Sequence, residues 1–282
     1  MMKKILKLSC FVLSLFIFGY THAQQNVCFS DNILCPAPPI VAVLPPMVVT
    51  PKVELPRCKA QQAYHTPSIP LQYFDTLEIR GDMEVELQTG SKRAYLEATG
   101  DLRILRNLNA NVYGNTLLIT RKDEICLRDC ERPRIRIHAN YLRRLIHRGN
   151  GNVHLNGVVN LEELTQEGTG IMQIYWVKGG VVTLHANGSG TIVLAGVAYQ
   201  LNADLAGQIH LDARFLRTKK GFIHTMQNSR ADVWVKDSLD AFAQGYSNIY
   251  YFTKPIYIYT ALLDGGSVLD MSSVHAAIVR FR

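Results

Sequence analysis

The chain has 282 residues, of which 48% are hydrophobic and 19% are charged, and its formal net charge is +7. Three lysines precede Ala23, so removal of an N-terminal leader would lower this charge from +7 to +4. Such a mild excess is a weak argument for nucleic acid, and export makes that partner less probable still. No segment after residue 23 is long and apolar enough to cross a membrane as a helix, which excludes a transmembrane segment from the mature chain.

The N-terminus has the pattern of a secretory signal peptide. A basic start is followed by an apolar run from Leu8 to Phe18, far shorter than the about 20 residues that a bilayer requires. Cleavage is expected after Ala23. We therefore predict that residues 1–23 are a signal peptide and that the protein is exported to the periplasm, the outer surface or the extracellular space.

Five cysteines remain after this cleavage, and in an oxidising compartment such residues tend to pair. Short loops would be closed by a bond between Cys28 and Cys35 and by another between Cys126 and Cys130. Cys58 would then stay unpaired, although five thiols leave other pairings open. A zinc site at the last two cysteines would require a second pair of ligands at suitable spacing, and none follows.

Residues 24–72 are predicted to form a proline-rich spacer that contains cysteines. From Cys35 to Pro56 the sequence is CPAPPIVAVLPPMVVTPKVELP. Proline fixes φ and removes a backbone donor, so an extended, semi-rigid segment is expected here.

The head domain is assigned to residues 73–282. Apolar and charged residues alternate in Leu77–Arg80 and Met83–Leu87, which indicates strands with one wet face. Residues 94–98 and 115–120 continue in this style, and a short helix capped by Asp101 is expected between them.

A repeat is expected from Pro133 onward. In Pro133–His138, Ile135 and Ile137 point to one side and the arginines to the other. The pattern small-x-aliphatic-x-aliphatic then recurs at offsets of 19, 20, 17, 24, 16 and 19 residues. Its occurrences are Gly151–Leu155, Gly170–Ile174, Gly190–Leu194, Gly207–Leu211, Ala231–Val235, Ser247–Tyr251 and Gly266–Asp270.

A period near twenty with short strands and small corner residues is typical of a β-solenoid. One strand of each coil stacks in parallel on the next, at a spacing of about 4.8 Å, and alternate side chains enter the core. The expected inward pairs are Val153 with Leu155, Ile192 with Leu194, and Ile209 with Leu211. The segment 216–230 fits this pattern worst, and Gly221–Thr225 is either an additional strand or an outward loop.

These segments resemble the family of exported bacterial proteins called putative auto-transporter adhesin, head GIN domain. The resemblance spans roughly residues 74–255 and rests on the order and spacing of several segments. They are FDTLEIRGDMEVELQTG, GNTLLITRKD, PRIRIHANYLRRLIHRGNGNV, the recurring GNG, GTG and GSG, and YSNIYYFTKP. The resemblance implies a right-handed β-helix-like fold in the cell envelope, and it supplies no catalytic residues. The expected fold class is therefore all-β, a right-handed single-stranded β-helix with coils of about 19 residues.

Three features that resemble catalytic or metal sites are interpreted structurally. Gly188-Ser-Gly190 is followed by a strand, whereas a phosphate-binding loop requires a helix N-terminus after its glycines. His154, His210 and His224 share an outward position, but a solvated face explains them better than a metal. The aspartates of the later strands fall on different register positions, so the paired acids of glycoside hydrolysis are not expected. We predict no catalytic residue, cofactor or metal.

The predicted ligand-binding residues are arginines and aromatics on outward positions. Seven arginines lie between residues 128 and 148, where outward guanidinium groups on successive strands would form a basic stripe for phosphate or carboxylate groups. The alternative is an ordinary charged strand face. Aromatic rings in the later repeats suit the apolar face of a sugar ring. The selected residues are Arg134, Arg136, Arg143, Arg144, Arg148, Trp234 and Tyr250.

The sequence thus predicts an exported, non-catalytic module that presents its β-solenoid faces to an envelope glycan or a surface protein. Two alternatives remain open. One is a polysaccharide-acting β-helix enzyme, and the other is a structural envelope protein that self-associates through the ends of the solenoid.

Overall fold

The computed structural model describes residues 63–122 and 131–273, which are almost entirely β-structure. All the predicted cysteine pairs, Cys58 and the signal peptide lie outside the described residues. The elements are β1 (Tyr64–His65), β2 (Ile69–Pro70), β3 (Thr76–Arg80), β4 (Glu84–Thr89), β5 (Tyr95–Gly100), α1 (Leu102–Leu105), β6 (Leu108–Tyr113), β7 (Thr116–Arg121), β8 (Arg134–Ala139), β9 (Arg144–Asn150), β10 (Val153–Asn156), β11 (Glu163–Thr225), β12 (Arg230–Gln244), β13 (Asn248–Tyr251), β14 (Tyr257–Leu263) and β15 (Ser267–Asp270).

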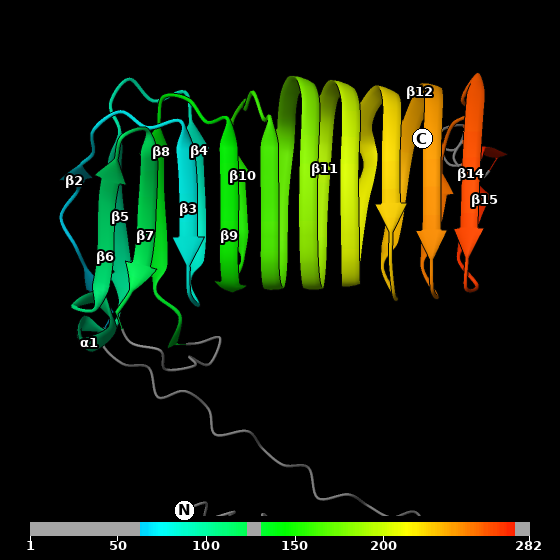
Figure 1. Cartoon of the computed structure of the whole chain (residues 1–282). Coiled ribbons are helices and arrows are strands. Elements are labelled where there is room, and N and C mark those ends of the chain that lie inside the picture. The colour runs from blue at the N-terminus through cyan, green and yellow to red at the C-terminus, as the bar shows by residue number, and fades with distance from the viewer. Residues whose placement is uncertain (1–62, 123–130, 274–282) are drawn as a thin grey trace, which may run out of the picture. The chain divides into compact units, whose positions relative to one another are not determined.

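The strands of the N-terminal half form two rows that meet in β11. One row has the order β5-β8-β4-β10-β11, and the other has the order β6-β7-β3-β9-β11 (Figure 1). Most neighbours in these rows are parallel, but β5 runs antiparallel to β8, and β6 runs antiparallel to β7. The short strands β1 and β2 also pair antiparallel with β5.

The chain does not stack its strands in sequence order at this end. Strand β4 lies between β8 and β10 and is parallel to both, with Val85 opposite Ile135 on one side and Val153 on the other. Strand β3 lies between β7 and β9 in the same way. The expectation that the repeat begins at Pro133 is therefore wrong, because β3 and β4 already belong to the parallel stack.

From β9 onward the chain adds strands in order. Leu155 lies opposite Ile174, Asn248 opposite Ser267, and Ser238 opposite Tyr257, each 19 residues further along the chain. Strand β11 continues for 63 residues, and Figure 1 shows its successive passes side by side. Each passage of the chain along the stack is called a pass below.

Glycines allow successive passes to lie in contact at the corners. Gly188 has φ +125°, in the region that favours glycine, and a Cβ there would overlap the carbonyl oxygen of Gly168. At Gly190 the backbone angle is ordinary, but a Cβ would overlap the carbonyl oxygen of Gly170. The interpretation of the Gly-Ser-Gly segment as a corner, with β-structure on both sides, is confirmed.

The core is a set of aliphatic rows between the strands. The predicted inward residues are confirmed, since Val153, Leu155, Ile192, Leu194, Ile209 and Leu211 are all at most 1% exposed. Ile135 and Ile137 are buried as well, while Arg134 and Arg136 are exposed. The alternation of strand residues thus places one set in the core and leaves the other set free for binding.

Two further expectations can be compared with the structure. The short helix is confirmed as α1, and the Asp101 carboxylate accepts a hydrogen bond from the Arg103 backbone amide at 2.8 Å. The undecided segment Gly221–Thr225 is a strand, because it pairs with β12 and buries Ile223.

Among the residues that the structure describes, no helix is long and apolar enough to cross a membrane.

Candidate functional site

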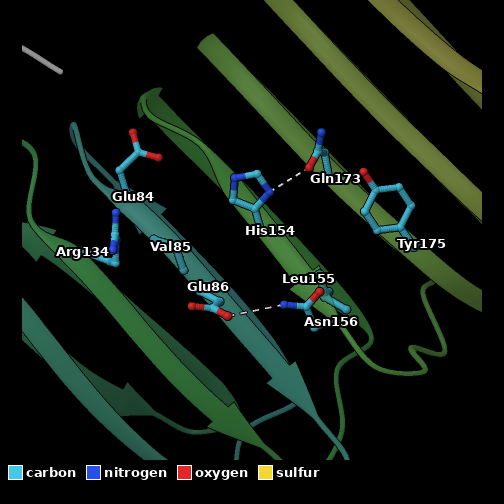
Figure 2. A pocket seen from close by; sticks show the side chains of 9 residues that line it. All are labelled: Glu84, Val85, Glu86, Arg134, His154, Leu155, Asn156, Gln173 and Tyr175. Atoms are coloured by element: carbon cyan, nitrogen blue, oxygen red, sulfur yellow. Dashed lines mark hydrogen bonds between the residues drawn. The ribbon is translucent and has the colours of Figure 1, made fainter. Parts of the chain in front are cut away.

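A shallow pocket of about 360 Å³ lies on the outward side of β4, β8, β10 and β11 (Figure 2). Its polar lining arises from the strand alternation. Val85 and Leu155 turn their side chains into the core, so Glu84, Glu86 and His154 point outward. Because β4 lies between β8 and β10, residues far apart in the sequence meet here.

One row of outward side chains crosses the pocket along the stack. The register places Glu97, Arg136, Glu86, His154 and Gln173 on neighbouring strands in this order. Arg136 Nε lies 3.3 Å from Glu86 Oε2, and His154 Nδ1 lies 2.9 Å from Gln173 Oε1. The alternating charges largely neutralise one another, and an exposed pair of this kind contributes about 0–1 kcal/mol to stability.

Glu84 and Arg134 occupy the adjacent row. Glu84 Oε1 is 3.4 Å from both Arg132 Nη1 and Asn152 Nδ2. Arg134 lies directly opposite Glu84 in the register, but its guanidinium forms no hydrogen bond or ion pair with any residue that the structure describes. The donors of Arg134 are therefore free for a ligand.

The pocket combines these polar groups with one aromatic side chain. Tyr175 is 45% exposed and stands beside Gln173 at the edge of the pocket (Figure 2). Carboxylate, guanidinium, imidazole and amide groups both donate and accept hydrogen bonds, and the ring offers an apolar face. This combination suits a ligand that is rich in hydroxyl groups.

The other predicted arginines lie in the second row of strands. Arg143 forms a bidentate pair with Glu162 at 2.9 and 2.7 Å, and these hydrogen bonds raise the pKa of the guanidinium. Arg148 contacts Glu78 at 3.0 Å and Glu167 at 3.1 Å. The structure thus brings Arg134 and Arg136 together, and Arg143, Arg144 and Arg148 elsewhere.

Arg144 and Arg143 line a separate shallow pocket of about 400 Å³, together with Glu162, Glu163 and Thr183. Arg144 Nε also donates to Thr76 Oγ1 at 3.2 Å. Glutamates therefore lie among the arginines on this side, as they do around Arg136.

The two predicted aromatic residues do not line the Figure 2 pocket. Tyr250 lies on β13, where the guanidinium carbon of Arg230 stands 4.4 Å from the ring centroid. Trp234 lies on β12 and lines a different groove with Tyr199 and Lys219. Sequence reasoning missed those two partners, although Lys219-Lys220 is a visible basic pair.

Asp212 and Asp232 lie directly opposite each other on β11 and β12. The expectation that the aspartates are scattered over different registers is wrong for this pair. It failed because an irregular segment follows Ala213 and changes the spacing to 20 residues.

Each of these carboxylates is held by an arginine two residues away. Hydrogen bonds from Arg214, at 2.9 and 2.6 Å, lower the pKa of Asp212. Burial raises the pKa of Asp232, but hydrogen bonds from His210 and Arg230 outweigh it and leave the pKa below its usual value. A glycosidase requires one carboxyl with a raised pKa as general acid, and neither member of this pair provides it.

The histidines make separate contacts. His210 Nε2 lies 3.2 Å from Asp232, whereas His224 Nδ1 lies 3.5 Å from Asp204, to which His185 also extends at 3.2 Å. Within residues 63–122 and 131–273, no group of three or more His, Cys, Asp or Glu side chains has an arrangement that could hold a metal ion.

Several solved structures share this fold. A putative adhesin from Bacteroides fragilis superposes with a TM-score of 0.67 at 16% identity, over 75% of this chain and 98% of that chain. A putative lipid binding protein and a putative adhesin, both from Parabacteroides distasonis, each give a TM-score of 0.57, at 17% and 18% identity, over 75% of this chain and 98% of theirs. Among curated proteins, no sequence matches this chain.

The family model described as putative auto-transporter adhesin, head GIN domain, matches residues 73–255. This range contains both rows of strands, the Figure 2 pocket and the Asp212–Asp232 pair. The chain therefore belongs to the putative auto-transporter adhesin, head GIN domain family.

Proposed function

We propose that the protein is an exported, non-catalytic binding module of the cell envelope, and that it binds a glycan at the Figure 2 pocket. The observation that carries this proposal is the free guanidinium of Arg134 beside a neutralised row of hydrogen-bonding side chains and the exposed ring of Tyr175. A sugar ring can stack on an aromatic face while its hydroxyl groups bond to planar polar side chains. The adhesin description of the family supports a surface role of this kind.

The scaffold of the proposed module is a right-handed β-solenoid with coils of about 19 residues, over residues 73–282. The parallel pairings at spacings of 19 residues and the overlapping corner glycines support it. A rigid stack of this kind would fix the distances between outward side chains on neighbouring coils, which favours recognition of a repeating polymer.

Export would depend on the signal peptide at residues 1–23, and residues 24–72 would then connect the head to the cell or to a partner. N-terminal sequencing of protein from the periplasmic, membrane and medium fractions tests this. A mature N-terminus at Gln24 is expected. Mass spectrometry of the same material under non-reducing conditions tests the bonds Cys28–Cys35 and Cys126–Cys130.

A glycan array tests the proposed binding activity. The unmodified protein is expected to bind a subset of envelope glycans, and Tyr175→Ala is expected to reduce that binding by about tenfold through loss of the stacking surface. Trp176→Ala is the matched control, because Trp176 is the neighbouring exposed aromatic but does not line the pocket. Equal loss in both variants, or none in Tyr175→Ala, would contradict a glycan site here. A surface protein captured through the same side chains would make the partner a protein.

Self-association is a second candidate function, and one observation favours it. All seven residues of β14 are exposed, including Tyr257 and Tyr259, and β14 pairs only with β12 among the described strands. An exposed apolar edge strand can pair with a second chain. Sedimentation velocity over a range of concentrations would reveal a dimer, and Tyr257→Lys with Tyr259→Lys would abolish it. A monomer at all concentrations would exclude this function.

A further inference from the structure

A groove of about 410 Å³ lies away from the Figure 2 pocket, on the segments around residues 197–199, 217–219 and 234–236. The pairing of Arg217 with Trp234 and of Thr218 with Val235 aligns two of these segments. Thr218 is buried and donates from Oγ1 to the Trp234 carbonyl at 2.8 Å, which holds the backbone of the two segments together. The groove therefore belongs to the rigid stack.

The groove has an apolar floor. Val197 is 60% exposed and Tyr199 is 47% exposed, and both stand next to Trp234 in the lining. Apolar surface of this extent on the outside of a stack of strands favours a ligand with an apolar face, and aromatic rings suit the faces of pyranose sugars.

The rim of the groove is basic and has no internal counter-charge. Arg217, Lys219 and Lys236 line it, and none of its lining residues is acidic. Their side chains form no ion pair with any residue in the described ranges. The ammonium groups of Lys219 and Lys220 lie 5.8 and 5.9 Å from the Tyr199 ring centroid, which directs two cations toward the floor.

This charge arrangement differs from that of the arginines considered above. Arg136, Arg143 and Arg148 each have a glutamate within 3.3 Å or less, so their charge is already neutralised. The cations of the groove repel one another, and an anionic ligand would relieve that repulsion. The positive charge available to a partner is therefore concentrated at the groove.

We propose that this groove binds an acidic polysaccharide, with sugar rings against Trp234 and Tyr199 and carboxylate groups against Lys219, Lys236 and Arg217. The inference extends the proposed binding role to a second site and names its ligand class. A polymer of pyranose rings fits a concave groove with aromatic walls, whereas the flat surface of a lipid bilayer does not enter one. Charge-assisted hydrogen bonds from ammonium and guanidinium groups to carboxylates supply the specificity.

Calorimetric titration with polygalacturonate, and with its fully methyl-esterified form as the neutral analogue, tests the inference. The unmodified protein is expected to bind the acid form, with an affinity that falls as salt is added, and to bind the ester about tenfold more weakly. The double variant Lys219→Ser with Lys236→Ser is expected to lose about tenfold in affinity for the acid form. The matched control is Arg143→Ser with Arg148→Ser, which removes two neutralised cations and is expected to bind like the unmodified protein.

Equal binding of acid and ester, or unchanged affinity in the lysine variant, would overturn the inference. Binding to phosphatidylglycerol vesicles without binding to the polymer would also overturn it. Arg134→Ser with Arg136→Ser separates the two proposals, because it is expected to leave the acid polymer bound while reducing binding at the Figure 2 pocket. If only that variant loses the polymer, the groove is not the site and the proposed function stands. If the unmodified protein binds no acidic polymer but still binds array glycans, the groove inference alone fails.

Discussion

Gly188 lies on Gly168 of the preceding pass so closely that a Cβ on Gly188 would overlap the Gly168 carbonyl oxygen. Gly168 stands in the same relation to Gly149, and Gly207 in the same relation to Gly188. This column of glycines holds four successive corners in contact. It explains why a segment with the composition of a ligand-binding loop has an architectural role here.

Replacement of Gly188 by alanine should destabilise the protein by about 1–3 kcal/mol or more, because it combines a positive φ with a backbone clash. Gly180→Ala is the matched control, since a Cβ at Gly180 has no atom within 4 Å and its φ is ordinary. Thermal unfolding followed by circular dichroism measures both. Similar melting temperatures for the two variants would show that the corners tolerate a side chain.

Leu194→Ala should cost about 2–5 kcal/mol, because Leu194 is fully buried and its removal leaves a cavity between passes. Val193→Ala, at the neighbouring outward position, should cost much less. Urea unfolding gives both values. A larger loss at Val193 than at Leu194 would mean that the inward and outward sets are exchanged.

His147 should make stability fall in mildly acidic solution. It is 1% exposed, its Nε2 has no hydrogen-bond partner among the described residues, and burial lowers its pKa to about 4. In the unfolded chain this pKa is about 6.5, so between these values the unfolded state binds more protons. Stability should therefore decrease as pH falls from about 6.5 to about 4, by about 3 kcal/mol in total.

The comparison of the unmodified protein with His147→Leu isolates this effect. Urea unfolding at pH 7 and at pH 4.5 should show a loss in the unmodified protein that the variant lacks. Identical pH dependence in the two proteins would show that His147 does not titrate in this window.

Asp232→Asn should destabilise the protein by about 1–3 kcal/mol at neutral pH, because it weakens the contacts of a buried carboxylate with Arg230 and His210. The pKa of Asp232 is lowered in the fold, so the stability that this carboxylate contributes is present above its unfolded pKa, near 3.9, and is lost as pH falls through the lower folded value. The difference between the two proteins should therefore shrink below pH 4. A constant difference down to pH 2 would contradict this assignment.

The core of the later passes could be predicted from the sequence because its signals are local. Alternation fixes which side of a strand is apolar, and glycine marks corners where passes touch, as the burial of Ile192 and Leu194 shows. The short helix after Asp101 was equally predictable from its cap.

The Figure 2 pocket could not be predicted in this way. It depends on the insertion of β4 between β8 and β10, which joins Glu86 to Arg136 across 50 residues and leaves no periodic signal. The Asp212–Asp232 pair was missed for a related reason, because the irregular segment after Ala213 changes the spacing. Outward residues are not constrained by packing, so their neighbours follow only from the exact register.

The most direct test of the proposed binding role is a glycan array that compares two double variants with the unmodified protein. Arg134→Ser with Arg136→Ser removes cations at the Figure 2 pocket, and Arg143→Ser with Arg148→Ser removes the same charge from the other row of strands. The proposal predicts that the unmodified protein and the second variant bind the same glycans, and that the first variant loses them. Absence of binding by the unmodified protein, or equal loss in both variants, would contradict it.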